Sequence, residues 1–497
     1  MEICLDRSRG FLTRSPHLIG GGSRCSGATA RGSMHRKQFV FPKMLLIQNP
    51  AAELDRNGSE RGLSSARILV RCLVAIFLLN VVSAALFIRL VNRPVYDDEL
   101  HLLDVHNYVT HGISTQALLS HRNAPGPLAY MWMTVGVRLL AGNELTGARV
   151  AVLMSWILLF VPIIVGARRS QFPGTWYGAL LVLLIFPHAL EATATVLTEG
   201  PALFFAILGV LVWIESGLPT AGTVISFAMA MAGAMMMGLS VTCRQFFLAL
   251  FPAAVALACF TWREKVPAQR FRWSLKVLVS LAFGTLPIIA MTLIWKGMSS
   301  PEMATGTSYS GWKVAVGMNW VRPLIVIFYT GLYLIPLTFP AMFRLRGSGR
   351  QLALLFAFLG GICVGHFEHI ILQPGPLNSV IRLASPVHAD AFLFDVISIV
   401  LIYNVVATLL LAWTGRQYLA KNAPALFGLL FILFFIVEQF GVGGNLPFYD
   451  RYVLHLAPFL GIVAFALLPQ LTTSRLLAFA CLSVFSQYML WRYAFGV

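Results

Sequence analysis

Three adjacent carboxylates, Asp97, Asp98 and Glu99, are the residues whose type and spacing most clearly suggest chemistry. Their negative charges repel one another, and such clusters occur where a protein binds a cation, takes up a substrate proton or meets a basic partner. The alternative is a solvated acidic patch where the chain leaves a membrane. The spacing alone fits both interpretations.

A second acidic position, Glu199, lies in a turn between two apolar segments and is followed by Gly200 and Pro201. Proline suits the first turn of a helix, and a carboxylate at a helix N-terminus is favoured by the helix dipole. Helix capping is therefore one interpretation of Glu199. The other is a site shared with Asp98, if both lie on the same side of the membrane.

Two arginines, Arg244 and Arg451, lie at the ends of apolar segments. A cation in that position needs a partner or a lipid phosphate. Asp450 offers Arg451 a local ion pair. An arginine also binds a phosphate well, because its guanidinium group donates two hydrogen bonds side by side and keeps its positive charge.

The sequence gives little support to a metal site or to other hydrolytic chemistry. On a helix, His366 and His369 would share a face while Glu368 points away, so a structural role is favoured for this group. The same interpretation holds for four further histidines: His101, His106, His111 and His388. The chain contains no phosphate-cradling glycine loop, no G-x-S-x-G and no H-E-x-x-H motif, and its seven cysteines form no C-x-x-C pair.

The composition predicts an all-α integral membrane protein. Of the 497 residues, 58% are hydrophobic and only 11% are charged, against about 25% charged in soluble proteins. Lys and Arg total 37 and Asp and Glu total 20. We assign this positive excess to cytoplasmic loops and expect no nucleic-acid partner.

Residues 1–66 differ from the rest, because Gly, Ser and Arg are frequent there and apolar runs are short. We expect either a disordered basic tail or a start codon assigned too far upstream, with Met34 or Met44 as the true first residue.

About 13 apolar segments follow within 67–497, each long enough to cross a bilayer. They lie near 67–90, 145–167, 176–193, 201–217, 221–241, 245–262, 275–296, 320–343, 352–371, 391–413, 424–441, 451–468 and 475–493.

The ambiguous segment 127–141 decides which loops are outside. If it does not span the membrane, the basic loops, such as that with Arg168 and Arg169, all fall in the cytoplasm, as the positive-inside rule favours. We therefore predict an interfacial or re-entrant helix at 127–141. Five loops are then extracytoplasmic: 91–144, 194–200, 297–319, 372–390 and 442–450.

The order of these elements resembles the polytopic GT-C glycosyltransferases, particularly relatives of protein O-mannosyltransferases and of the aminoarabinose transferases of lipid A. The resemblance rests on one membrane helix, an outer loop that begins with Asp98-Glu99 and ends at a proline-rich step before a Tyr/Trp helix, a helix with Arg149, and Glu199-Gly-Pro. It covers about 67–260 and Arg451-Tyr452. It implies a GT-C-like fold whose first outer loop, 91–144, carries short juxtamembrane helices and the catalytic residues.

The resemblance implies transfer of a sugar from a polyprenyl-phosphate donor to a lipid, glycan or protein acceptor on the extracytoplasmic face of a plasma or inner membrane. Asp98 matches the acid that activates the acceptor hydroxyl, and Glu99 matches its neighbour. Glu199 matches a second acid that holds a metal or the acceptor. Arg451 and Tyr452 match a pair associated with the carrier phosphate, and we add Arg244 as a second phosphate clamp.

Two departures from the family pattern leave the metal open. Relatives often carry an acid and a lysine where this chain has Arg122-Asn123-Ala124, and an aspartate where it has Glu199. A divalent cation is the one cofactor that the resemblance allows.

The main alternative is a transporter or flippase that uses the outer carboxylates as a binding site. Such folds often show inverted repeats with broken helices near the midplane. We find no convincing internal repeat, and the acids gather on one face. A purely structural assembly subunit is a second alternative.

Overall fold

The computed structural model describes residues 59–495, with gaps at 96, 124–125, 141–142, 218–223, 263–266, 298, 305–318, 367–389, 442–449 and 468–472. The chain divides into two units, 1–64 and 65–497, and the second holds all the residues discussed below. Most of the expected tail, including Met34 and Met44, lies outside the described residues. Its last part belongs to the helix α2 (Ser59–Leu90).

Within the described ranges the chain is helical and contains no strand, as its composition predicts. Seven stretches are long and apolar enough to span a membrane. They are α2, α6 (Glu144–Arg169), α10 (Val224–Cys243), η1 with α11 (Gln245–Ala249 and Leu250–Trp262), α12 with α13 (Pro267–Gly284 and Leu286–Trp295), α17 (Gly347–His366) and α20 (Asp390–Thr414).

Further helices account for the other predicted segments. Four are shorter and apolar: α7 (Pro173–Ile185), α15 (Arg322–Thr338), α22 (Ala423–Glu438) and α23 (Ala457–Leu467). Two others are α9 (Glu199–Glu215) and α24 (Thr473–Phe495), and single helical turns form at α14 (Pro301–Ala304), α16 (Ala341–Arg344) and α21 (Arg416–Leu419). The count of about 13 spans stays a prediction.

The segment expected at 176–193 is not one continuous helix. Helix α7 ends at Ile185, and the short helix α8 (Ala189–Ala194) follows a turn. Pro187 lies in that turn and explains the break, because proline has no backbone N–H and disfavours a helical conformation in the residue before it. The break turns His188 and Glu191 into the protein interior, where both are buried.

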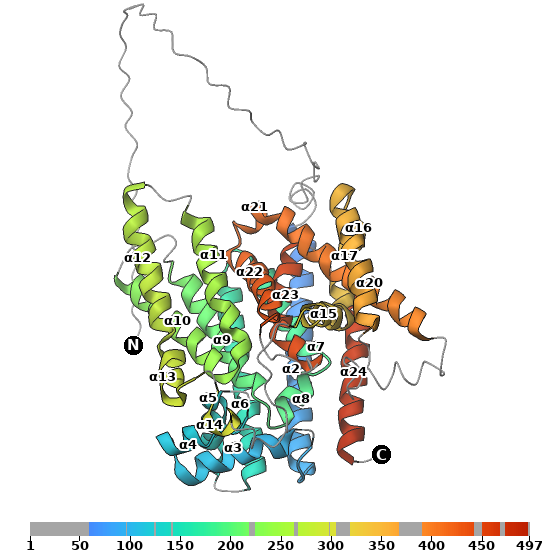
Figure 1. The fold of residues 1–497 in the computed structure, drawn as a ribbon. Helices are drawn as coiled ribbons and strands as arrows, with labels where there is room; N and C mark the ends of the chain where they lie inside the picture. Colours follow the sequence, from blue (N-terminus) through green and yellow to red (C-terminus); the bar gives the residue numbers. More distant parts are fainter. Residues whose placement is uncertain are drawn as a thin grey trace, which may run out of the picture. The chain divides into compact units, whose positions relative to one another are not determined.

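The segment 91–144, predicted to be the first outer loop and called the outer loop below, forms three short helices, as expected: α3 (Asp98–His111), α4 (Thr115–Leu119) and α5 (Pro127–Leu140). They lie together in Figure 1. Helix α5 has 14 residues, too few for the roughly 20 of a spanning helix. This length agrees with the interfacial helix predicted at 127–141.

Helices α7 and α23 pack closely because glycines meet at their crossing. A Cβ on Gly178 would lie 2.7 Å from the carbonyl oxygen of Gly461 and 2.5 Å from the ring of Phe465. Only a residue without a side chain fits there. This contact fixes α23 and the 3-10 turn η2 (Asp450–His455) that precedes it.

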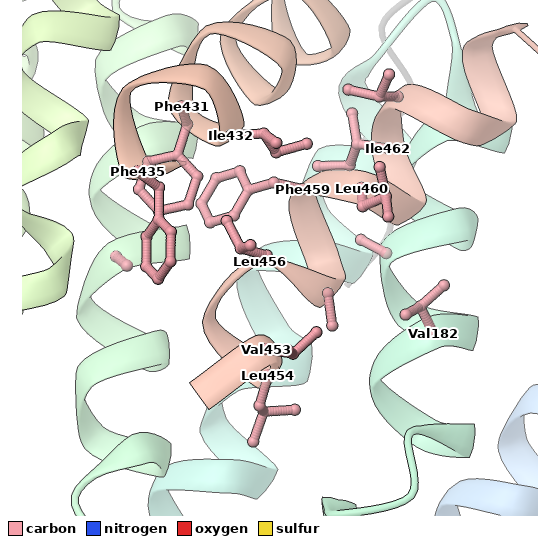
Figure 2. Packing of buried hydrophobic residues seen from close by; sticks show 14 of the residues in the cluster. Val182, Phe431, Ile432, Phe435, Val453, Leu454, Leu456, Phe459, Leu460 and Ile462 are labelled. Carbon is pink, nitrogen blue, oxygen red and sulfur yellow. The ribbon is translucent and has the colours of Figure 1, made fainter. Parts of the chain in front are cut away.

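An aromatic and aliphatic core surrounds the junction of η2 and α23. Figure 2 shows Phe431 and Phe435 of α22 facing Phe459 and Leu456. The ring centroids of Phe431 and Phe459 are 4.2 Å apart. Buried aromatic pairs of this kind contribute beyond their buried area, and here they hold the turn that carries Arg451.

Candidate functional site

A buried cluster of ionised groups is assembled from four separate parts of the chain. Asp97 precedes α3, Glu199 begins α9, Arg244 precedes η1, and Arg451 lies in η2. The hydrogen bond from Arg451 to Asp97 joins residues 354 positions apart in the sequence. The segments 91–144 and 194–200 are in contact here, because the N–H of Val196 donates to Oδ1 of Asp98.

Arg451 is the centre of this cluster. Its Nη2 donates to Oδ2 of Asp97, its Nη1 lies 3.4 Å from Oε1 of Glu191, and its Nε lies 3.8 Å from Oε1 of Glu199. The side chain is 10% exposed. A charge so deeply buried is stable only when opposite charges surround it, and three carboxylates do so.

Arg244 is the second arginine of the cluster. Its Nη2 donates to Oε1 of Glu199 at 2.5 Å. Its guanidinium carbon lies 5.0 Å from the ring centroid of Tyr452, and that of Arg451 lies 5.7 Å from the same ring. Both guanidinium groups therefore lie within cation–π distance of the Tyr452 ring. Phe246 packs on Tyr452, with 5.0 Å between centroids.

Asp98, the acid predicted as the base, lies in a different environment. Its side chain is 0% exposed, against 32% for Asp97. Oδ2 accepts from Nη2 of Arg149 at 2.6 Å and from the N–H of Val95 at 3.0 Å, while Oδ1 accepts from the N–H of Val196 at 2.5 Å. Both oxygens are thus engaged in fixing the start of α3.

Arg149 completes this anchor from α6. Besides Asp98, it donates to the carbonyl oxygens of Val91 and Arg93, at 2.5 and 2.9 Å. One guanidinium therefore joins the end of the first membrane helix to the start of the outer loop. Glu99, the other predicted catalytic residue, is exposed in the first turn of α3.

Asp104 anchors the second half of the outer loop. Its carboxylate accepts from the N–H groups of Arg122 and Asn123, at 2.9 and 3.0 Å, and from the Asn123 amide at 2.8 Å. The N–H of Gly126 then donates to the carbonyl oxygen of Cys243, next to Arg244. The loop is thereby tied to the end of α10, directly before Arg244 and η1.

Charge and burial set the protonation states near Asp97. Burial works to raise the pKa of Asp97, but the charge of Arg451 outweighs it and holds the pKa below its ordinary value. Burial lowers the pKa of His101 to about 4, so this imidazole is neutral near pH 7. Nδ1 of His101 lies 2.7 Å from the hydroxyl of Tyr130.

Among the described residues, no group of three His, Cys, Asp or Glu side chains is placed to hold a metal ion. His366 is exposed, while Glu368, His369 and His388 lie outside the described residues, as does the Asp450 side chain. Nε of Arg122 lies 3.9 Å from Oε1 of Glu302. Metal dependence therefore stays a prediction for experiment.

Sequence reasoning missed two members of the cluster, Glu191 and His188. Both lie in the segment 176–193, which its apolar composition marks as membrane-spanning. A carboxylate inside such a segment is by itself a functional-site hypothesis, and Glu191 could have been found on that ground. Its pairing with Arg451 could not, because 260 residues separate them.

This arrangement can bind a phosphate and accept a proton. Two guanidinium groups beside one aromatic ring match a phosphate ester. A partly exposed carboxylate, Asp97, lies against one of them and is ionised at neutral pH. Deprotonation of a hydroxyl beside a bound phosphate is the chemistry that these groups can perform together.

No family model matches this chain, and no curated protein sequence matches it. Two solved structures of ArnT from Cupriavidus metallidurans are similar to it. The structure of ArnT bound to undecaprenyl phosphate has 15% identity and a TM-score of 0.41, and the match covers 85% of this chain and 77% of that one. The apo structure has 16% identity and a TM-score of 0.40, with 86% and 78% covered.

Proposed function

We propose that this protein is a GT-C-type glycosyltransferase that moves a hexose or pentose from a polyprenyl phosphate to an acceptor hydroxyl. The observation that carries the proposal is the pair of buried arginines, Arg244 and Arg451, which both contact Glu199 and the ring of Tyr452, with Asp97 against Arg451. We place the site on the extracytoplasmic face of a plasma or inner membrane, because the basic loops then remain in the cytoplasm.

The phosphate of the donor binds the two guanidinium groups. Both groups contact carboxylates, Arg451 with Asp97 and Arg244 with Glu199. A phosphate competes for the same N–H donors. When Arg451 pairs with the phosphate, Asp97 loses the interaction that lowers its pKa. The pKa of Asp97 then rises, and Asp97 becomes a stronger base. Donor binding thus prepares the site for the acceptor.

The transfer step forms one bond and breaks another. The acceptor oxygen forms a bond to the anomeric carbon, and the bond from that carbon to the phosphate oxygen breaks. The electron pair of that bond passes to the phosphate, whose added negative charge the two arginines stabilise. The acceptor proton passes to Asp97. A lipid, a glycan or a protein hydroxyl fits this scheme.

Asp97 takes the role of base in this proposal, in place of its neighbour Asp98. A base must reach the proton that it abstracts. Asp98 is enclosed and its oxygens are occupied, whereas Asp97 is partly exposed. Asp98 and Arg149 would hold the helix that presents Asp97. Glu199 would orient Arg244.

We expect transfer to continue when EDTA removes divalent cations, because two guanidinium groups already supply positive charge to the leaving phosphate.

Transfer assays on membranes test this proposal. Membranes that contain the wild type, Arg451→Ala or the exposed control Arg168→Ala receive radiolabelled polyprenyl-phosphate sugars with lipid, polymer and protein acceptors. We expect label in an acceptor with the wild type and Arg168→Ala, and none with Arg451→Ala. If the wild type transfers no label from any donor, the proposal fails, and uptake into proteoliposomes becomes the test of a transporter.

A further inference from the structure

A chain of hydrogen bonds between buried side chains connects Arg451 to Tyr333, and the transfer mechanism does not use it. Oε1 of Glu191 lies 3.4 Å from Nη1 of Arg451. Oε2 of Glu191 lies 2.7 Å from Nδ1 of His188, and Nε2 of His188 lies 3.1 Å from the hydroxyl of Tyr333. All four side chains are buried.

With a neutral His188, the chemistry of these groups fixes the direction of the chain. An ionised carboxylate only accepts hydrogen bonds, so Nδ1 of His188 carries the hydrogen that reaches Glu191. In the neutral imidazole Nε2 then accepts, and the Tyr333 hydroxyl donates to it. One tautomer satisfies both contacts. The second oxygen of Glu191 is left facing Arg451 with its negative charge.

The chain joins three separate elements. Arg451 lies in η2, a 3-10 turn of 6 residues, and its long side chain has several rotatable bonds that must be held to orient the guanidinium. Tyr333 projects from the middle of α15, a helix of 17 residues. His188 and Glu191 belong to the start of α8. The guanidinium is therefore braced against a helix rather than against its own turn.

We propose that Glu191, held by His188 and Tyr333, is a positioning residue for Arg451. It fixes one edge of the guanidinium, so that the other N–H groups face the space where the donor phosphate binds. Supporting groups of this kind keep a functional side chain within the narrow range of geometry that binding needs. The identity of the ligand rests on the proposed function, whereas the orientation of Arg451 by Glu191 can be tested without it.

A merely structural role for the same contacts makes a different prediction. If the chain only satisfied buried polar groups, its loss would lower stability and leave the reactivity of Arg451 in the folded protein unchanged. Tyr333→Phe is a mild probe, because it removes one hydroxyl and keeps the ring that packs on Phe186 and His188, at centroid distances of 5.6 and 5.2 Å.

The direct test is the rate at which phenylglyoxal modifies Arg451 in the purified full chain, followed by peptide mass spectrometry. Glu191→Gln keeps the shape and removes the charge, and Glu215→Gln at the end of α9 is the matched control. We expect Arg451 to react about tenfold faster in Glu191→Gln, as the loss of one charged hydrogen bond implies. An intermediate rate is expected in Tyr333→Phe, and the wild-type rate in Glu215→Gln.

Equal Arg451 reaction rates in the wild type, Glu191→Gln and Tyr333→Phe would overturn the inference. Thermal unfolding identifies the variants that fold. If Glu191→Gln does not fold, the labelling rate in Tyr333→Phe decides the question.

Kinetic measurements with the donor substrate separate this inference from the proposed function. We expect kcat/KM for the donor to fall about tenfold in Glu191→Gln, with the acceptor KM unchanged. A wild type that transfers nothing refutes the function and leaves the labelling result to decide the role of Glu191.

Discussion

At the scale of single residues, the site is a balance of buried charges. Asp97, Glu191 and Glu199 contact Arg451, and Glu199 also contacts Arg244. Removing one member leaves its partners buried and unpaired, which costs more than the contact itself contributed. Substitutions of the three carboxylates should therefore keep the shape of the side chain, as Asn and Gln do for Asp and Glu.

His101 makes stability depend on pH in a defined window. Its pKa is about 4 in the folded protein, because of burial, against 6.5 for the ordinary side chain. Between these values the unfolded chain binds a proton that the folded chain does not, so stability falls as the pH drops from 6.5 to 4. The shift corresponds to about 3 kcal/mol at most.

Thermal unfolding between pH 7 and 4 tests this expectation. His101→Gln should unfold with a weaker pH dependence than the wild type, whereas the exposed control His106→Gln should keep the wild-type dependence. The same slope in His101→Gln and the wild type would show that His101 does not carry this effect.

The sequence predicted which residue types form the site, but it did not separate the three adjacent acids. Consecutive residues on a helix point about 100° apart. At the start of α3 this turns Asp98 inward to Arg149 and leaves Glu99 exposed, while Asp97, just before the helix, reaches Arg451. Which acid meets which arginine depends on contacts between distant segments, and local spacing carries no information on those.

At the scale of helices, the contact between α7 and α23 fixes the turn that bears Arg451. We expect Gly178→Ala to separate these helices, because its Cβ would lie 2.5 Å from the ring of Phe465. Overpacking of this kind costs about 1–3 kcal/mol. A Cβ on Gly174, in the same helix, would meet no other described part of the chain within 4 Å, so Gly174→Ala is the control.

Thermal unfolding of the two alanine variants in one detergent tests this contact. Gly178→Ala should melt below the wild type and lose donor affinity as η2 shifts. Gly174→Ala should melt at or above the wild-type temperature, because alanine favours a helix more than glycine does. Equal melting temperatures for both variants would contradict the close packing.

Helix positions were largely predictable, and helix breaks were not. Apolar length located α6 and α20 to within a few residues. The expected segment at 176–193 was broken, although Pro187 was visible in the sequence, because hydrophobicity alone does not distinguish one long helix from two short ones. That break brings Glu191 into the site.

At the scale of the whole molecule, the proposal depends on which side of the membrane each loop occupies. We expect Thr110→Cys, exposed on α3, to react with a membrane-impermeant maleimide in intact cells when the native cysteines are replaced by serine. Arg350→Cys, exposed at the start of α17, should react only after permeabilisation. The reverse pattern would place the site in the cytoplasm and contradict the predicted topology.

The proposed mechanism as a whole depends on Asp97 as the group that accepts the acceptor's proton. Transfer of labelled sugar by the purified wild type, Asp97→Asn and Asp98→Asn, each confirmed to be folded, tests this role. We predict that Asp97→Asn stays folded, because Arg451 keeps its contacts with Glu191 and Glu199, and that it loses about 10²–10⁴-fold in kcat. Asp98→Asn should lose stability together with activity, because it breaks the buried pair with Arg149. Transfer at the wild-type rate by Asp97→Asn would show that Asp97 is not the base.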